Sequence, residues 1–341
     1  MKDHLQFGIV GCGMIARYHA VAIQQTDRCS LLGACSKTYA STETFSQEVG
    51  CTPFASYEEM LANPDLDVVV ICSSSGEHFH QAKEALEAGK HVIVEKPMCL
   101  TMADADALVE LDKQYPQTVC VISQSRFSDA AQAIKAAIDA GSFGKMVSAS
   151  LMMRYFRSQA YYDQAAWRGT VAGDGGGVLM NQGIHGIDLL CHFMGKPVGV
   201  TGYARTMLRD IEVEDTAAAA IEFESGAIAT LDATVCSQPS FSKKFILCGE
   251  KGTVVMEEDA ILSWSLPEPC PIPLGAKSGN SASADPKGIS VAYHLREYED
   301  FVGHVLDGKK LMLDADQGRM PLGVILGVYE SSRTGKHIKL S

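Results

Sequence analysis

The sequence lacks long hydrophobic runs and an excess of positive charge. No stretch of about 18 consecutive apolar residues occurs in the 341 residues, so no transmembrane helix is expected. Lys and Arg number 29 against 41 Asp and Glu, which gives a net charge of −12. A chain this acidic lacks the electrostatic footprint of a general nucleic-acid binder, and anionic lipid would repel it. The segment 1–6 has no apolar signal-peptide core, so we expect a cytoplasmic protein with neither nucleic-acid nor membrane partners.

The cysteines also lack a functional spacing. The chain has 11 of them, an odd number, with no CxxC motif and no disulfide-like pattern. Several lie in apolar runs, as expected for buried thiols in a reducing compartment. The 10 histidines are dispersed, and no group of His, Cys and Asp residues shares a metal-ligand spacing. The sequence therefore predicts no metal site.

What the sequence does contain is a regular alternation of strand-like and helix-like segments over residues 1–123. A continuous apolar run such as 68–72 indicates a strand buried on both faces, which is typical of a parallel sheet covered by helices. The expected strands are 7–10, 31–35, 68–72, 91–94 and 119–123, and the expected helices are 15–25, 41–49, a short one after 56, 79–88 and 101–114. We therefore predict a doubly wound Rossmann domain over residues 1–123.

From residue 124 onward the strands follow one another with few helices between them. Two hairpins are expected, 217–223 with 227–235 and 245–248 with 253–256. Helices are expected at 130–140, 294–306 and 317–332, and a loop at 267–290. Residues 124–341 are therefore predicted to form an α+β domain with a mainly antiparallel sheet. The fold class is α/β overall, with a length that suits about two domains.

A glycine turn joins the first strand to the first helix. The pattern Gly11-x-Gly13-x-x-Ala16 is weak alone, but here it has the strand–turn–helix context that dinucleotide binding requires. Gly11 permits the tight turn, Gly13 lets the backbone approach a pyrophosphate, and Ala16 keeps the helix close to the sheet. The first helical residues, Met14 and Ile15, then offer unpaired N–H groups to the phosphates.

The end of the second strand bears on the choice of cofactor. NAD-binding folds usually carry an acidic residue there to hold the ribose 2′-hydroxyl. This chain has Ser36-Lys37 instead, a hydroxyl and a cation that suit a 2′-phosphate. The pair favours NADP, but Lys37 could equally be an ordinary exposed loop lysine, so NAD stays open.

Two further motifs carry candidate chemistry. Lys96 follows the expected strand 91–94, and ligands of open α/β sheets lie beyond the carboxyl ends of the strands. Downstream, a glycine-rich run opens a helix on which Asn181, His185 and Asp188 are spaced i, i+4, i+7 and are expected to share one face. The alternative is a solvated helix face with a stray histidine. The apolar residues around this helix favour the wall of a site.

Together, the glycine turn, Glu95-Lys96-Pro97 and the run ending in Asn181 and His185 resemble the glucose–fructose oxidoreductase / inositol dehydrogenase / MocA (Gfo/Idh/MocA) family. The similarity continues through the segments 155–157, 167–170, 214–216 and 329–335, and so covers most of the chain. The resemblance implies a Rossmann domain, a second domain with a large open sheet, and oligomers built through that sheet. It also implies hydride transfer to or from sugars, polyols and their derivatives.

The chain departs from the family pattern at two places. Asn181 stands where many members carry Asp, and asparagine can hold a hydroxyl but cannot take its proton. Here and at Trp167-Arg168 the chain is similar to members that act on sugar nucleotides, such as the UDP-N-acetylglucosaminuronate dehydrogenases. The segment 73–78 replaces a Thr-Pro-Asn-x-x-His pattern with serines but keeps His78.

The resemblance also extends the set of candidate site residues. Expected cofactor contacts are Gly11, Gly13, Met14, Ile15, Ser36, Lys37, Ser73, Ser74, His78, Glu95, Lys96, Gln124, Trp167 and Arg168. Expected substrate contacts are Lys96, Arg154, Tyr155, Asn181 and His185, with Arg157 and Asp174 as further candidates. The alternative for the arginines and aromatic residues is ordinary surface or core packing.

The residue types indicate the reaction. As hydride leaves the carbon of a secondary alcohol, a base must take the hydroxyl proton. His185 is a natural acid–base group near neutral pH, and Lys96 can polarise the oxygen or pass the proton. The sequence leaves open which of them transfers the proton, with Asn181 expected to orient the hydroxyl.

We therefore predict an NAD(P)-dependent oxidoreductase acting on CH–OH groups of a sugar, polyol or sugar nucleotide. Two other classes stay open: a glycosidase that retains its dinucleotide and acts by oxidation and elimination, and a non-enzymatic dinucleotide sensor. The expected assembly is a homodimer or homotetramer.

Overall fold

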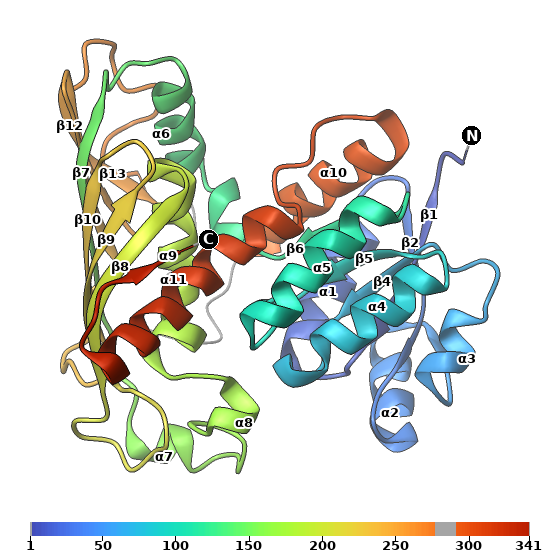
Figure 1. Ribbon diagram of the computed structural model, residues 1–341. Coiled ribbons are helices and arrows are strands. Elements are labelled where there is room, and N and C mark those ends of the chain that lie inside the picture. The colour runs from blue at the N-terminus through green and yellow to red at the C-terminus, as the bar shows by residue number, and fades with distance from the viewer. Residues whose placement is uncertain (1, 277–290, 341) are drawn as a thin grey trace. The chain divides into compact units, whose positions relative to one another are not determined.

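The computed structural model describes residues 2–276 and 291–340 (Figure 1). The chain divides into two compact units, which we call the N-terminal unit (Met1–Gln124 with Val291–Arg319) and the C-terminal unit (Ser125–Ser290 with Met320–Ser341). None of the helices in the described ranges combines the length and apolar character that a membrane span requires. The predicted loop at 267–290 lies outside the described residues from 277 on.

The N-terminal unit is built on a six-stranded parallel sheet in the order β3-β2-β1-β4-β5-β6. Its strands are β1 (Leu5–Val10), β2 (Cys29–Cys35), β3 (Thr52–Pro53), β4 (Val68–Ile71), β5 (His91–Val94) and β6 (Val119–Val121). All the side chains of β4 are buried. Since successive side chains of a strand point to opposite faces, both faces of the sheet are covered. The predicted doubly wound fold is confirmed.

The N-terminal unit also contains helices. They are α1 (Met14–Gln25), α2 (Tyr39–Val49), α3 (Tyr57–Leu61), α4 (His78–Glu87), α5 (Met102–Gln114) and α10 (Val291–Asp307), with the short 3-10 helix η1 (Ser75–Glu77). Two of these helices begin with a side-chain cap. The hydroxyl of Ser56 accepts the Glu59 N–H, and that of Thr101 accepts the Asp104 N–H.

Helix α10 lies far from the Rossmann segment in sequence but belongs to the N-terminal unit. It packs on α1, and its Tyr298 and Phe301 rings lie 5.7 and 6.3 Å from the ring of Phe7. Burial of these aromatic rings holds α10 in place. The compact units therefore differ here from the expected domain ranges 1–123 and 124–341, because local sequence patterns do not encode a contact across nearly 300 residues.

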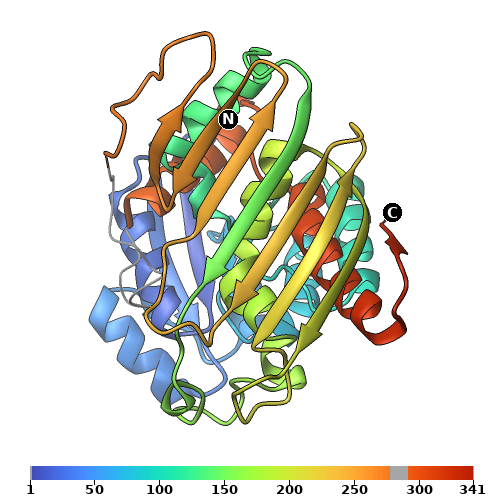
Figure 2. The same cartoon turned by 90° about the vertical axis from the view of Figure 1, so that its left-hand side faces the viewer.

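The C-terminal unit contains an eight-stranded sheet in the order β13-β12-β11-β7-β10-β9-β8-β14 (Figure 2). Its strands are β7 (Met146–Arg154), β8 (Pro197–Arg205), β9 (Thr216–Phe223), β10 (Ile228–Thr234), β11 (Lys244–Gly249), β12 (Gly252–Glu257), β13 (Ala260–Trp264) and β14 (Ile338–Lys339). Strands β7 and β10 pair in parallel, and the other neighbours within the described residues pair antiparallel. The mainly antiparallel sheet and both hairpins are as predicted.

Helices cover one face of this sheet, and Figure 2 looks onto the other. The helices are η2 (Gln124–Phe127), α6 (Asp129–Asp139), α7 (Gln159–Tyr162), α8 (Val171–Asp174), the π-helix η3 (Val178–Gly183), α9 (Ile184–Met194) and α11 (Ala315–Thr334). The segment 217–220 has no alternation of polar and apolar residues, which predicts a strand covered on both faces. In the single chain Ala217 is buried, but Ala218 and Ala220 are exposed on the open face, as normal strand alternation requires.

Candidate active site

The glycine turn after β1 has the geometry that a close-approaching phosphate needs. Gly11 has φ +94°, and a Cβ there would lie 2.6 Å from the carbonyl of Cys72, so only glycine fits. A Cβ on Gly13 would meet no atom within 4 Å, which leaves the backbone open at the start of α1. No side chain in the described ranges caps this helix. The N–H groups of its first turn are therefore available, and the turn fits the pyrophosphate of a dinucleotide.

The end of β2 carries no acidic side chain. Ser36 is half-buried and Lys37 is exposed. The Cys12 thiol in the glycine turn donates to the carbonyl of Cys35 at 3.6 Å, which ties the turn to the end of β2. The hydroxyl and the cation predicted to meet a ribose phosphate therefore follow the strand that adjoins the glycine turn.

Beyond β4, His78 fastens two loops together. Its Nδ1 lies 2.8 Å from the carbonyl oxygen of Pro97, and its Nε2 lies 3.2 Å from that of Ser73. The ring is buried, and burial lowers the pKa of His78. The Ser73 hydroxyl donates to Gln81 at 2.7 Å, whereas Ser74 is exposed. His78 therefore braces the backbone at the expected cofactor site rather than extending into solvent.

The Glu95 side chain also faces the interior of the unit. Its carboxylate lies 3.0 Å from His19 Nε2 and accepts the Lys96 backbone N–H at 2.9 Å. Burial alone would raise the pKa of Glu95, but the hydrogen bond from His19 and the neighbouring charges of His19, Lys96 and His294 lower it to about 2. Lys96 itself is half-buried at the carboxyl end of β5. Gln124, at the start of η2, has a buried Oε1 without a hydrogen-bond partner in the described residues.

The structure brings together one metal-capable group that the sequence spacing did not reveal. His19, Glu95 and His294 are buried, and one ligand atom of each lies within 4.8 Å of the others. They come from α1, the end of β5 and α10. This set could hold a metal ion, although His19 and Glu95 already bond to each other.

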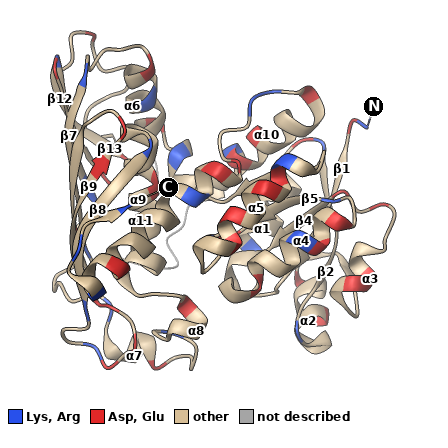
Figure 3. Cartoon of the chain, in the orientation of Figure 1, with Lys and Arg blue, Asp and Glu red and all other residues tan. Residues whose placement is uncertain are grey.

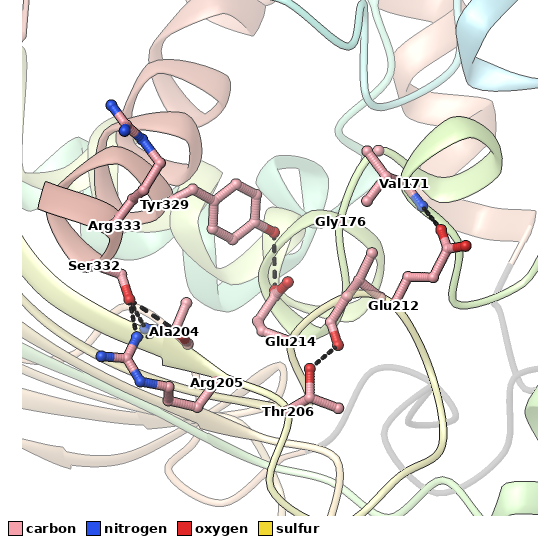
Figure 4. Close-up of a pocket in the computed structure, with 12 residues that line it drawn as sticks. Val171, Gly176, Ala204, Arg205, Thr206, Glu212, Glu214, Tyr329, Ser332 and Arg333 are labelled. Atoms are coloured by element: carbon pink, nitrogen blue, oxygen red, sulfur yellow. Dashed lines mark hydrogen bonds between the residues drawn. The ribbon is translucent and has the colours of Figure 1, made fainter.

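In the C-terminal unit, Glu214 fixes the start of the helix that carries Asn181 and His185. Its carboxylate accepts the N–H groups of Gly177 and Leu179 at 2.8 and 2.9 Å, and the Tyr329 hydroxyl at 2.8 Å (Figure 4). Burial raises the pKa of Glu214, and these hydrogen bonds offset only part of that rise. A Cβ on Gly177 would overlap the Glu214 carbonyl. The glycine run therefore allows close packing against Glu214, a role that the position of Glu214 in the sequence does not indicate.

The predicted polar face of this helix is divided in the structure. Asn181 lies in the π-helical η3, and both Asn181 and His185 are half-buried. Asp188 is buried and accepts two hydrogen bonds from the Arg126 guanidinium, at 2.8 and 2.6 Å. It therefore does not share an open face with the other two. A buried bidentate ion pair of this kind holds α9 to η2.

Asp174 holds the amide of Asn181. Its Oδ1 accepts from Asn181 Nδ2 at 3.0 Å, and its Oδ2 accepts the Gly169 N–H at 2.7 Å. With the Nδ2 group engaged in this way, the carbonyl oxygen of the amide points away from Asp174. From the sequence, Asp174 is only a candidate for ligand contact. The structure shows that it binds the Asn181 side chain.

The other candidate residues of this unit fall into two groups. Arg154 pairs with Asp232 across the sheet, and Tyr155 is buried. The second group, which we call the arginine–aromatic cluster, comprises Arg157, Tyr161, Trp167 and Arg168. The guanidinium carbons of Arg157 and Arg168 lie 5.7 and 4.5 Å from the Tyr161 ring, and Arg168 lies 5.3 Å from Trp167, which is 52% exposed.

A cavity of about 370 Å³ lies in the same unit (Figure 4). Its wall includes Val171, Gly176, Glu214, Tyr329 and Arg333. None of the predicted site residues is among its described lining residues. Glu214 lines the cavity, whereas Asn181 and His185 are not among its described lining residues.

These features define a class of protein. A parallel doubly wound sheet with an open glycine turn, followed by a lysine at the carboxyl end of a strand, is typical of a dinucleotide-dependent dehydrogenase. The family model described as "Oxidoreductase family, NAD-binding Rossmann fold" matches residues 5–124, and that of the "GFO/IDH/MocA C-terminal domain" matches residues 131–255. The chain belongs to the Gfo/Idh/MocA oxidoreductase family and is a dehydrogenase acting on CH–OH groups.

Solved structures and curated proteins agree with this assignment. The WlbA dehydrogenase of Bordetella pertussis, in complex with NADH and UDP-GlcNAcA, is 32% identical over 99% of both chains, with a TM-score of 0.87. The WlbA dehydrogenase of Chromobacterium violaceum is 30% identical over 99% of this chain and 96% of its own, also with a TM-score of 0.87. The myo-inositol 2-dehydrogenase of Thermotoga maritima is 23% identical over 98% of both chains.

Proposed function

We propose that the protein transfers a hydride between a nicotinamide dinucleotide and a secondary hydroxyl carbon of a sugar derivative, and that this substrate is a sugar nucleotide. The observation that carries the proposal is the open glycine turn at Gly11 and Gly13 in a chain that also holds Lys96, Asn181 and His185. The similarity over nearly the whole chain to a dehydrogenase bound to UDP-GlcNAcA supports this substrate class.

The bound dinucleotide would supply a nicotinamide ring that accepts or returns the hydride. The side chains of this protein orient the substrate hydroxyl and accept or donate its proton. Lys96 and His185 are the groups that hold or take the hydroxyl proton. Asn181, oriented by Asp174, accepts the hydroxyl in a hydrogen bond without titrating.

The arginine–aromatic cluster favours an anionic substrate. A chain with a net charge of −12 gathers Arg157 and Arg168 around Tyr161 and leaves Trp167 half-exposed beside them. Guanidinium groups bind phosphate and carboxylate oxygens, and an exposed indole can stack on a base. UDP-GlcNAcA offers all of these groups, whereas an inositol offers hydroxyls alone.

A substrate screen tests the proposal directly. UDP-GlcNAcA, its analogue UDP-GlcNAc without the sugar carboxylate, myo-inositol and simple glucosides should each be incubated with NADP or NAD, and the reduced nicotinamide followed by absorbance. We expect turnover with the sugar nucleotide that exceeds turnover with inositol. Equal or greater turnover with inositol would contradict the proposed substrate class.

We propose NADP as the preferred dinucleotide, because Ser36 and Lys37 stand where an acidic residue would repel a 2′-phosphate. NAD is the alternative, and both WlbA structures contain NADH. Equilibrium binding of NADPH and NADH separates the two. An NADH affinity at least tenfold above that for NADPH would contradict the proposal, where tenfold corresponds to about 1.4 kcal/mol.

Ser36→Asp should shift the preference toward NAD. A carboxylate at the end of β2 would repel the 2′-phosphate and accept the ribose hydroxyls, so we expect the ratio of the NADPH and NADH dissociation constants to change by about tenfold or more. Thr44→Asp, which adds the same charge on an exposed face of α2, is the matched control and should leave the ratio unchanged. An unchanged ratio in Ser36→Asp would remove this position from cofactor selection.

The open face of the C-terminal sheet should mediate self-association. It carries small side chains beside Tyr203 and Ile228, which are 64% and 59% exposed. Exposed apolar patches on a regular sheet commonly mark interfaces. Light scattering should show a dimer or tetramer of the 36.6 kDa chain, and Thr230→Arg at the centre of this face should reduce its mass. Glu43→Arg on α2 should not, and a wild-type monomer at micromolar concentration would refute the prediction.

A further inference from the structure

A buried chain of hydrogen bonds runs beneath the backbone of Lys96. Nδ1 of His19, on α1, lies 2.9 Å from the Tyr298 hydroxyl on α10, and Nε2 lies 3.0 Å from Oε1 of Glu95. The other carboxylate oxygen of Glu95, Oε2, accepts the Lys96 N–H at 2.9 Å. His19 and Tyr298 are fully buried, and Glu95 is 6% exposed. Three elements of the N-terminal unit thus converge on one peptide group.

The hydrogen-bond partners fix the proton on His19. The Glu95 carboxylate accepts the Lys96 N–H at Oε2, so Nε2 of His19 is the donor to its other oxygen, Oε1. In a neutral imidazole the other nitrogen, Nδ1, is then an acceptor, and the Tyr298 hydroxyl supplies its proton. The direction of donation therefore runs from Tyr298 through His19 to Glu95, which is left with one oxygen for Lys96.

This arrangement does more than fill space. A buried polar chain loses hydration that an apolar set of the same volume would not need, so packing alone does not account for it. The chain of hydrogen bonds ends at the backbone N–H of Lys96, the residue that carries the reactive ammonium. In the same segment, His78 lies 2.8 Å from the carbonyl oxygen of Pro97. The backbone from 95 to 97 is therefore held at Lys96 through the Glu95 carboxylate and at Pro97 by His78.

We propose that His19 is a positioning residue for Lys96. Protonated on Nε2 and oriented by the Tyr298 hydroxyl, it holds the Glu95 carboxylate that fixes the Lys96 backbone at the end of β5. Because α1 also begins at the glycine turn, the same helix that offers N–H groups to the dinucleotide sets the position of the lysine. The inference rests on the role proposed for Lys96 above.

The first test compares two substitutions that differ only in hydrogen bonding. His19→Gln can still donate to Glu95 and accept from Tyr298, whereas His19→Leu can do neither. We expect His19→Leu to lower kcat by about tenfold or more, since small displacements of a catalytic group cost such factors, with the dinucleotide dissociation constant within about threefold of wild type. We expect His19→Gln to restore kcat to within about threefold of wild type.

The matched control is His91→Leu. His91 begins the same strand β5 at its other end, where its Nδ1 accepts the Thr118 N–H at 3.0 Å. It should lower the melting temperature but leave kcat per folded molecule unchanged. If His19→Leu behaves like His91→Leu, or if His19→Gln is as impaired as His19→Leu, the positioning role is wrong.

A second measurement needs no activity. Nitrogen-15 NMR of histidine-labelled protein without ligand reports which ring nitrogen carries the proton, with the His19 signal assigned by its loss in His19→Gln. We expect the Nε2-protonated tautomer in wild type and also in Tyr298→Phe, because the Glu95 carboxylate still requires Nε2 to donate. An Nδ1-protonated His19 would overturn the proposal even in an active enzyme. Failure of the wild type to turn over any CH–OH substrate would instead overturn the proposed function and leave the NMR result to test the geometry.

Discussion

Lys96→Met should reduce hydride transfer by about 10² or more while dinucleotide binding remains measurable. Methionine keeps the length of the side chain but can neither donate a hydrogen bond nor hold a proton, and loss of a positioned acid–base group costs about 10²–10⁴ in rate. The Lys96 backbone N–H bond to Glu95 should survive, because the substitution leaves that peptide group intact. The effect should therefore appear in kcat rather than in folding.

Single-turnover absorbance of the reduced nicotinamide measures this effect, and dinucleotide fluorescence measures binding in the same samples. Lys83→Met is the matched control. Lys83 lies on α4 of the same unit, is about half-exposed and pairs with Glu87, so its loss should change neither quantity. Turnover of Lys96→Met near the wild-type value would remove Lys96 from the mechanism.

His185→Ala should slow turnover and remove the pH dependence of alcohol oxidation. As the base, the imidazole must be neutral when it takes the hydroxyl proton, so the wild-type rate should rise with pH as the imidazole loses its proton. In the reverse direction the imidazolium is the acid, and the rate of ketone reduction should fall over the same range. Both limbs should flatten in His185→Ala.

Asn181→Ala separates orientation from proton transfer. The amide of Asn181 is held by Asp174 and carries no titratable proton. We expect slower turnover with the midpoint of the pH profile unchanged. If His185→Ala keeps the wild-type pH profile, the assignment fails and Lys96 is the remaining candidate for proton transfer.

The parts of the fold that the sequence predicts are those determined by local pattern. The buried run at β4 and the glycine at φ +94° each follow from a few adjacent residues. The two hairpins were equally visible, because Gly226 and the segment 249–252 mark turns between apolar strands. These features led directly to the fold and to the cofactor class.

The parts that the sequence does not predict depend on contacts between distant segments. His19 and Tyr298 are 279 positions apart, and Glu214 reaches Gly177 across 37. In the sequence, Asp188 is one of three polar residues on a helix face. No residue near it in the sequence indicates that it is buried and paired with Arg126. The sequence therefore identified the candidate reacting groups but not the side chains that hold them in place.

Isotope transfer can show directly whether the protein moves a hydride from a hydroxyl-bearing sugar carbon to a nicotinamide ring. The substrate is a UDP-GlcNAcA whose sugar ring carries deuterium at its secondary hydroxyl carbons, incubated with oxidised dinucleotide and analysed by mass spectrometry. We expect one deuterium in each reduced dinucleotide and an equal amount of keto-sugar nucleotide. Cleavage to UDP and free sugar, with the dinucleotide left oxidised overall and free of deuterium, would contradict it.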